Sequence, residues 1–227
     1  NVLFIIGELS KAENLYELTR LSWQLPHYFS AHAKKAGDYD IAGKILSQAT
    51  DIMTRKLIGF FQQANGKAPM MFAWLVYGSQ AREDQTMGSD QDNGLLLAER
   101  PSEAQSAYFS NMAQYVCNGL AKCGIKLCDG NIMASNPKLR LSLDEALEEA
   151  KQWVKAPTKD AIMHFNIFLD LLGISKDFLQ GSTSASAFYY RKPFENKIKS
   201  IKTEKIIKLK KIGCRVFQDT AAIKTFY

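Results

Sequence analysis

A glycine and a serine, and two aspartates that begin after ten intervening residues, are the residues of this chain whose types and spacing could do chemistry. Gly78 and Ser79 come directly after the apolar run 71–77, and Asp90 and Asp92 open the next apolar segment. A glycine permits a tight turn and lets a phosphate group approach the backbone closely. Alternate side chains of a strand project from the same face, so we expect the two carboxylates to lie side by side.

Such a pair of carboxylates suits a hard divalent cation. Mg2+ and Mn2+ prefer oxygen ligands, and the phosphates of a nucleoside triphosphate would supply the remaining ones. Two ions held about 3.5–4 Å apart would neutralise an attacked phosphoryl group and activate an incoming hydroxyl group. Ser79 adds a hydroxyl group and a backbone N–H, and if a short helix begins near Gln80, its free N–H groups favour an anion. Arg82 is a nearby cation whose planar guanidinium group matches phosphate oxygens. The segment therefore predicts a site for a metal and a triphosphate.

The elements that must position this segment predict an α+β fold. Short apolar runs indicate strands at 72–77, 92–97 and 125–128. A long helix is expected over 102–123, with Ser102 as its N-cap. Strands alternating with helices favour an open mixed sheet.

Helices are expected on both sides of this region. The first part of the chain has helical spacing over 15–30, interrupted at Pro26, and again over 41–57. A later helix near 143–154 begins with Ser142 and Glu145, the pattern of a capping box. After Pro157 the pattern becomes mostly helical, beginning with residues 161–172, so we expect two domains, residues 1–156 and residues 157–227.

The segment 68–97 resembles the active-site signature of the DNA polymerase β-like nucleotidyltransferase superfamily, in which Gly-Ser is followed by Asp-x-Asp. It is more closely similar to a bacterial nucleotidyltransferase family that accompanies cyclic-nucleotide-binding and CBS domains and is related to the amino-terminal part of the PII uridylyltransferase. The segments 128–143 and 165–179 resemble later blocks of the same family. The resemblance implies a small mixed-sheet nucleotidyltransferase domain with N-terminal helices, followed by a helical, incomplete substrate-binding domain.

The resemblance also implies an activity and a cofactor. The expected reaction moves a nucleoside monophosphate from a nucleoside triphosphate to an acceptor hydroxyl group and releases pyrophosphate. Mg2+ or Mn2+ would assist it, and a protein, through a tyrosine hydroxyl, is one candidate acceptor. Flanking domains in a longer bacterial signalling protein would sense ligands.

The expected site residues are two metal-binding aspartates, a third acid and a nucleotide-binding set. Asp90 and Asp92 would hold the metal and be catalytic. Asp129 is the best candidate for the third acid by position, although Cys128–Asn131 also has the chemistry of an ordinary turn. Asp170 is the second candidate. The expected nucleotide-binding residues are Gly78, Ser79, Arg82, Gln85, Ser89 and Asn93. The last three would act by supporting the turn.

Several positions differ from the family pattern. Ala81 stands where the family has glycine, and Asp84 where it has glutamate. In the helical part, Leu172 and Ala222 replace two expected arginines. These differences support an alternative function, in which the protein is a non-catalytic module of a signalling protein that binds nucleotide and Mg2+.

Charge is concentrated in the segment 188–215, which has ten Lys or Arg residues against two glutamates. Such a patch could attract a nucleic acid or an acidic protein, or it could be the solvated face of a helix. Few aromatic residues lie among the lysines, which disfavours stacking with single-stranded nucleic acid. We therefore favour the solvated helix face.

Composition places the chain among ordinary globular proteins. Its 227 residues are 46% hydrophobic, which is enough for a core. No signal-like leader and no apolar run of about 18 residues is visible, so a cytoplasmic location and no membrane contact are expected. The chain lacks a starting methionine, which suggests an excerpt of a longer protein. Four cysteines and three histidines show no zinc-site spacing, and disulfides are not expected in a reducing compartment.

Overall fold

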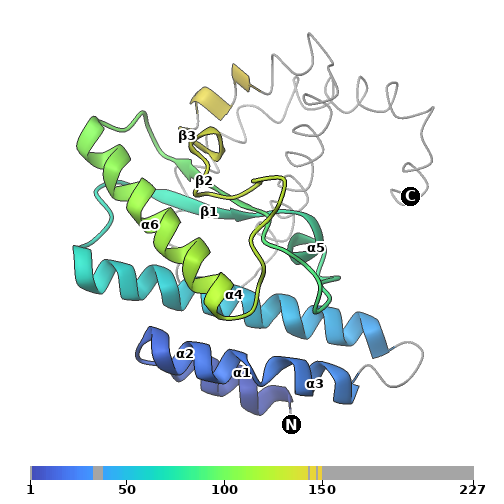
Figure 1. Ribbon diagram of the computed structural model, residues 1–227. Coiled ribbons are helices and arrows are strands. Elements are labelled where there is room, and N and C mark those ends of the chain that lie inside the picture. Colours follow the sequence, from blue (N-terminus) through green and yellow to red (C-terminus); the bar gives the residue numbers. More distant parts are fainter. Residues whose placement is uncertain (1, 33–37, 143, 147, 150–227) are drawn as a thin grey trace, which may run out of the picture.

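The computed structural model describes residues 2–32, 38–142, 144–146 and 148–149, and it has the expected α+β fold (Figure 1). Three N-terminal helices precede one long helix, and a small sheet with one further long helix follows. In chain order the elements are α1 (Val2–Lys11), α2 (Leu15–Ser22), α3 (Leu25–His32), α4 (Asp38–Asn65), β1 (Phe72–Val76), α5 (Gly78–Ala81), β2 (Asn93–Leu97), α6 (Glu103–Lys122), a 3-10 turn (Pro137–Leu139) and β3 (Arg140–Ser142).

The caps predicted at Ser102 and Ser142 are confirmed by their hydrogen bonds. Ser102 precedes α6, its hydroxyl accepts from the N–H of Gln105, and the Gln105 side chain accepts from the N–H of Ser102. Ser142 and Glu145 make the same reciprocal pair, with 2.9 Å from the Ser142 N–H to Glu145 Oε2. These contacts satisfy N–H groups that have no partner inside a helix.

Two features of the N-terminal region differ from the prediction. The interruption of the helical region 15–30, expected at Pro26, lies at residues 23–24 instead, since α2 ends at Ser22 and α3 begins at Leu25, with Pro26 in its first turn. Proline is tolerated there because the first turn of a helix needs no N–H partner. Helix α1 was not predicted, because the unbroken apolar run 2–6 shows no helical period.

The three strands form a mixed sheet in the order β1-β2-β3. Strands β1 and β2 are antiparallel, with Phe72 opposite Leu97 and Val76 opposite Asn93. Strand β3 lies parallel to β2 along its other edge. The predicted strands 72–77 and 92–97 are therefore confirmed to within one residue.

The predicted strand 125–128 is wrong except at one position. Only Lys126 pairs, in a single parallel bridge with Asp90, and the chain then turns at Asp129 and Gly130. The third strand of the described sheet is β3, which is only three residues long. So short a strand leaves no alternating pattern to recognise.

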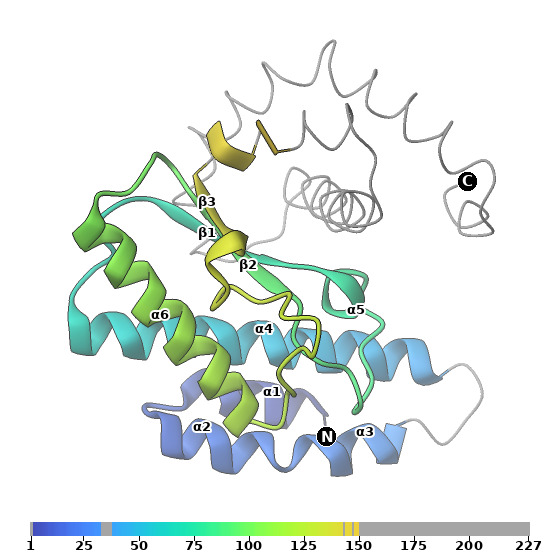
Figure 2. The same ribbon diagram turned by 45° about the horizontal axis from the view of Figure 1, so that its top comes forward.

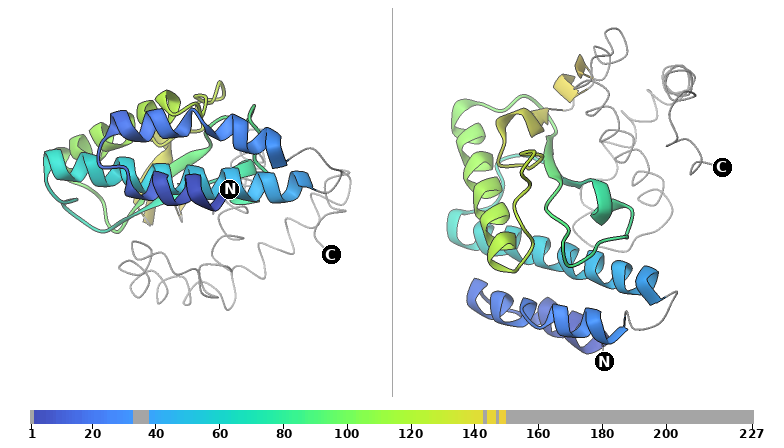
Figure 3. Two further views of the ribbon diagram at one scale, coloured as in Figure 1. Left: turned by 90° about the horizontal axis from the view of Figure 1, so that it is seen from below. Right: turned by 45° about the vertical axis from the view of Figure 1, so that its right-hand side comes forward.

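Helix α4 is the centre of the molecule. It contacts α6 on one side and α1, α2 and α3 on the other. Figures 2 and 3 show the blue N-terminal helices on the side of α4 that faces away from the sheet. Leu57 of α4, Phe109 of α6 and Leu95 of β2 belong to one hydrophobic cluster, which also includes Leu9 of α1. The N-terminal helices and the sheet thus share one core.

Several sequence predictions lie outside the described residues. They concern the second domain 157–227, the basic segment 188–215, and Asp170, Leu172 and Ala222. Among the described helices, none has the length and apolar composition to cross a membrane.

Candidate metal and phosphate site

The glycine–serine turn lies directly against one of the two aspartates. The backbone N–H of Tyr77 donates to the carbonyl of Asp92 at 2.9 Å, which continues the β1–β2 ladder to this turn. Gly78 then has φ of +56°, and a Cβ atom there would lie 2.6 Å from Asp92 Oδ2. Only glycine suits both the left-handed backbone and the approach of the carboxylate.

Alternation along the entry to β2 directs the two aspartates to one side. Gln91 and Asn93 are each 1% exposed, whereas Asp90 and Asp92 are half-buried. Because successive side chains of an extended chain point to opposite sides, burial of the two amides directs the carboxylates the other way.

The two buried amide side chains are held by hydrogen bonds to the backbone of other segments. Gln91 Nε2 donates to the carbonyls of Cys117 and Ile125, at 2.9 and 3.0 Å. Asn93 Oδ1 accepts from the N–H of Ala134 at 2.8 Å. Gln91 was not predicted as a functional residue, although the alternation Asp-Gln-Asp-Asn was a visible signal that the amides face inward.

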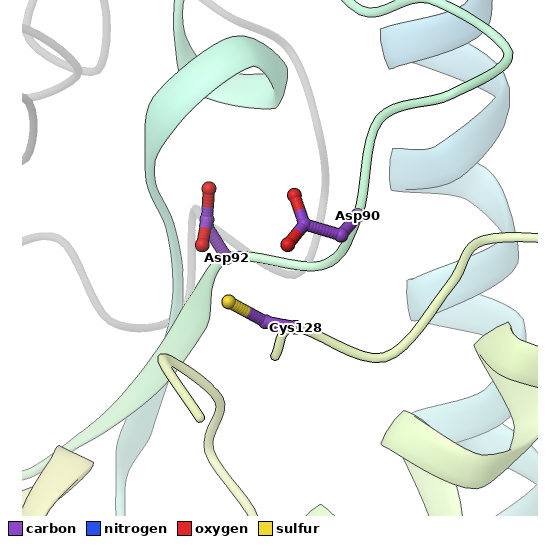
Figure 4. Close-up of side chains that lie close together, drawn as sticks. All are labelled: Asp90, Asp92 and Cys128. Atoms are coloured by element: carbon purple, nitrogen blue, oxygen red, sulfur yellow. The ribbon is translucent and has the colours of Figure 1, made fainter. Parts of the chain in front are cut away.

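The side chain of Cys128 lies close to the carboxylates of the two aspartates (Figure 4). One ligand atom of each of Asp90, Asp92 and Cys128 lies within 4.8 Å of the other two. Burial raises the pKa of the Cys128 thiol. The backbone N–H groups of Ile132 and Gly130 act in the opposite direction, and the carboxylates of Asp90 and Asp92 raise this pKa further. The sequence pattern did not identify this cysteine, because it lies far along the chain from the aspartates.

Asp129, the predicted third acid, occupies the exposed turn directly after Cys128. Its carboxylate is not part of the group of three ligand atoms. The turn brings the preceding side chain to the aspartates instead, because neighbouring residues point in different directions. Asp129 stays a prediction for the catalytic base.

The predicted nucleotide-binding residues have different environments. Arg82 lies at the surface, with its Nε 3.1 Å from Asp84 Oδ2. The Ser89 hydroxyl accepts from the N–H of Thr86 at 2.9 Å, so it supports the turn before the aspartates. Gln85 is 1% exposed, and neither its side-chain nitrogen nor its oxygen has a hydrogen-bond partner among the described residues.

Helix α4 holds the loop that contains these residues. Gln80 Nε2 donates to Asp51 Oδ1 of α4 at 2.7 Å, and burial raises the pKa of the Asp51 carboxyl group. Two turns earlier in α4, a Cβ atom on Gly43 would lie 3.1–3.2 Å from backbone atoms of the segment 83–85. The loop after the glycine–serine turn is therefore packed directly on α4.

The donors gathered here fit a divalent cation. Two carboxylates and one thiol converge from two segments of the chain, and each is only half-buried. Carboxylates and thiols are both protein ligands for divalent metals. The absence of a side chain at Gly78 lets the Asp92 carboxylate lie against the glycine–serine turn, so a cation held by the carboxylates would lie beside this turn.

A comparison with protein families agrees with this chemistry. A family whose description reads "Putative nucleotidyltransferase DUF294" matches residues 24–160, more than half of the chain. The matched region includes the glycine–serine turn, both aspartates and Cys128. No curated protein and no solved structure matches the chain significantly.

Proposed function

The chain belongs to the DUF294 nucleotidyltransferase family, and on this premise we propose that it moves a nucleoside monophosphate from a nucleoside triphosphate to an acceptor hydroxyl group. The observation that supports this reaction best is the position of Asp92, whose carboxylate lies against Gly78 in the glycine–serine turn and beside the ligand atom of Asp90. The proposed metal-binding pair therefore lies beside the proposed phosphate-binding turn.

Each residue has a defined part in the proposed site. The carboxylates of Asp90 and Asp92 hold the cation, for which Mg2+ and Mn2+ are the proposed ions. When bound, such an ion supplies charge neutralisation at the phosphates and activates the attacking hydroxyl group. Gly78 and Ser79 hold the triphosphate through their backbone and the serine hydroxyl. Arg82 exchanges its surface partner Asp84 for phosphate oxygens.

The proposed transfer forms one phosphorus–oxygen bond and breaks another. The acceptor oxygen forms a bond to the α-phosphorus, and the bond from that phosphorus to the oxygen that bridges to the β-phosphate breaks. Pyrophosphate leaves with the electron pair of the broken bond, and the acceptor proton passes to a base, for which Asp129 is the proposed residue. The proposed acceptor is a protein hydroxyl group, as in the PII uridylyltransferase that the sequence resembles.

Pyrophosphate release tests this function. The protein is incubated with ATP, GTP, CTP or UTP and Mg2+ or Mn2+, together with a protein extract that supplies acceptors, and nucleotides labelled at the α-phosphate report transfer. Asp90→Asn and Asp92→Asn should each lower the rate by about 100-fold or more, because a bound metal contributes several kcal/mol of charge stabilisation. Glu99→Gln, an exposed carboxylate just after β2, serves as the control. Asp129→Asn should lower the rate only if Asp129 is the base.

A second function is favoured because the predicted third acid, Asp129, is not in the group of converging ligand atoms and a thiol lies beside the two aspartates instead. Two carboxylates and a cysteine, rather than three carboxylates, converge in the described part of the chain. This set is compatible with a module that binds nucleotide and metal and regulates another domain without transfer. Such a module would show a nucleotide- and Mg2+-dependent rise in melting temperature, because ligand binding stabilises the native state. It would give no pyrophosphate with any nucleotide, and this result would reject the transferase.

A further inference from the structure

The group formed by Asp90, Asp92 and Cys128 combines hard and soft donor atoms. In a tetrahedral site, a carboxylate oxygen and a thiolate sulfur on one Zn2+-sized ion are about 3.6 Å apart, given metal–oxygen and metal–sulfur bonds of about 2.1 and 2.3 Å. The ligand atoms lie within 4.8 Å of one another, so an oxygen–sulfur separation would have to shorten by at most about 1.2 Å for both atoms to bind one ion. Rotation of half-buried side chains can supply such a movement.

The loop of Cys128 is held in place by contacts that do not involve the aspartates' carboxylates. The Asn93 N–H donates to the carbonyl of Ile132 at 3.0 Å, and the Cys128 N–H donates to Met133 Sδ at 3.4 Å. The backbone N–H groups of Gly130 and Ile132 also face the sulfur of Cys128. Groups that hydrogen-bond to a metal ligand orient it and adjust its basicity. The sulfur is thus aimed at the aspartates by its own loop.

We propose that Cys128 is the third protein ligand when the site of Asp90 and Asp92 holds a borderline cation such as Co2+ or Zn2+, and that its sulfur adds affinity for such a cation while Mg2+ binds through oxygen alone. Mg2+ takes oxygen ligands and keeps several waters, so with Mg2+ the sulfur stays outside the coordination shell. Co2+, Zn2+ and Cd2+ accept both sulfur and oxygen. The proposal rests on the proposed function only for the position of the cation.

Titration with Co2+ tests the bond to sulfur directly. The wild-type protein should develop a thiolate-to-cobalt charge-transfer absorption, and Cys128→Ser should lose it. Cys123→Ser is the matched control, because Cys123 is buried against Thr19 of α2 and is not part of the ligand group. The affinity for Cd2+ should fall at least about tenfold in Cys128→Ser, since even outer partners of a bound metal contribute about 10–100-fold. The affinity for Mg2+ should stay within a factor of about two, because Mg2+ makes no bond to sulfur.

A second measurement uses only the unmodified protein. Iodoacetamide alkylates free thiols, and mass spectrometry of the peptide that contains Cys128 reports its modification. Cd2+ should protect Cys128 from alkylation, whereas Mg2+ at a saturating concentration should not. Equal protection by both ions, or by neither, would overturn the proposal even if Cys128→Ser were to fold poorly.

The outcomes separate this proposal from the proposed function. If Asp92→Asn abolishes Cd2+ binding while Cys128→Ser retains both the affinity and the cobalt absorption, the cation site stands and the role of the sulfur is rejected. If Cys128→Ser loses the absorption while no nucleotide is turned over with any ion, the sulfur ligand stands and the transferase is rejected.

Discussion

Gly78 is the residue at which backbone geometry and site chemistry depend on each other most directly. Its φ of +56° and the 2.6 Å that would separate an added Cβ from Asp92 Oδ2 are independent reasons for glycine. Gly66, which follows α4, shares the first reason but not the second, because its φ is +86° and no atom lies within 4 Å of an added Cβ. A substitution at Gly66 can therefore serve as the control for the same substitution at Gly78.

We expect Gly78→Ala and Gly66→Ala to lose similar amounts of stability, each about 1–2 kcal/mol from the left-handed backbone. Only Gly78→Ala should also weaken binding of Mn2+, by about tenfold or more, because the new methyl group displaces the Asp92 carboxylate. Chemical denaturation measures the first effect, and calorimetric titration with Mn2+ measures the second. Equal Mn2+ affinities in the two variants would show that Asp92 does not need its position beside Gly78.

At the scale of elements, α4 links the core to the site. Its later part contributes Leu57 to the core shared with α6, and its earlier part supports the site loop through Gly43 and Asp51. The Asp51 carboxylate is unfavourably buried, yet its bond to Gln80 joins the helix to the residue directly after the glycine–serine pair. One rigid helix thus fixes the loop relative to the sheet.

Two glycines of α4 test this support. An alanine at Gly59, where no atom lies within 4 Å of an added Cβ, should raise the free energy of unfolding by up to about 1 kcal/mol through helix propensity. An alanine at Gly43 meets the backbone of 83–85, and overpacking of this kind costs about 1–3 kcal/mol. We therefore expect Gly43→Ala to be at least about 1 kcal/mol less stable than Gly59→Ala in urea denaturation. Equal gains in the two variants would contradict close packing of the loop on α4.

At the scale of the whole molecule, the N-terminal helices belong to the same core as the sheet. The family match begins at residue 24, after α1 and α2, yet Ile5, Leu9 and Leu18 are each 0% exposed. They lie in one hydrophobic cluster with residues of α4, α6 and β2. The stability of the site should therefore depend on helices that lie outside the matched region.

Leu9→Ala should lower the free energy of unfolding by about 2–5 kcal/mol, because it leaves a cavity in a fully buried part of the core. Phe4→Ala on the same helix is the control, since Phe4 is 60% exposed and should change stability little. Urea denaturation measures both variants. A Leu9→Ala protein as stable as Phe4→Ala would show that α1 packs only loosely on α4.

Local patterns determined much of this fold. The strands at 72–77 and 92–97, the helix after Ser102 and the capping box at Ser142 follow from apolar runs and cap residues, which act within a few positions of the chain. The adjacency of Asp90 and Asp92 likewise follows from alternation along an extended segment. For the same reason, the sequence determined the candidate metal-binding pair and the turn beside it.

Tertiary structure decided what depends on distant segments. Cys128 meets the aspartates because contacts between distant segments hold its loop: Asn93 binds it at Ile132 and Ala134, about forty residues away, and Gln91 binds the segment before it at Ile125. In the predicted strand 125–128 only Lys126 pairs, with Asp90, and α4 holds the site loop through Asp51 and Gly43. The sequence by itself determined which carboxylates could bind a cation, whereas the packing of loop, sheet and helix decided that a sulfur atom lies beside them.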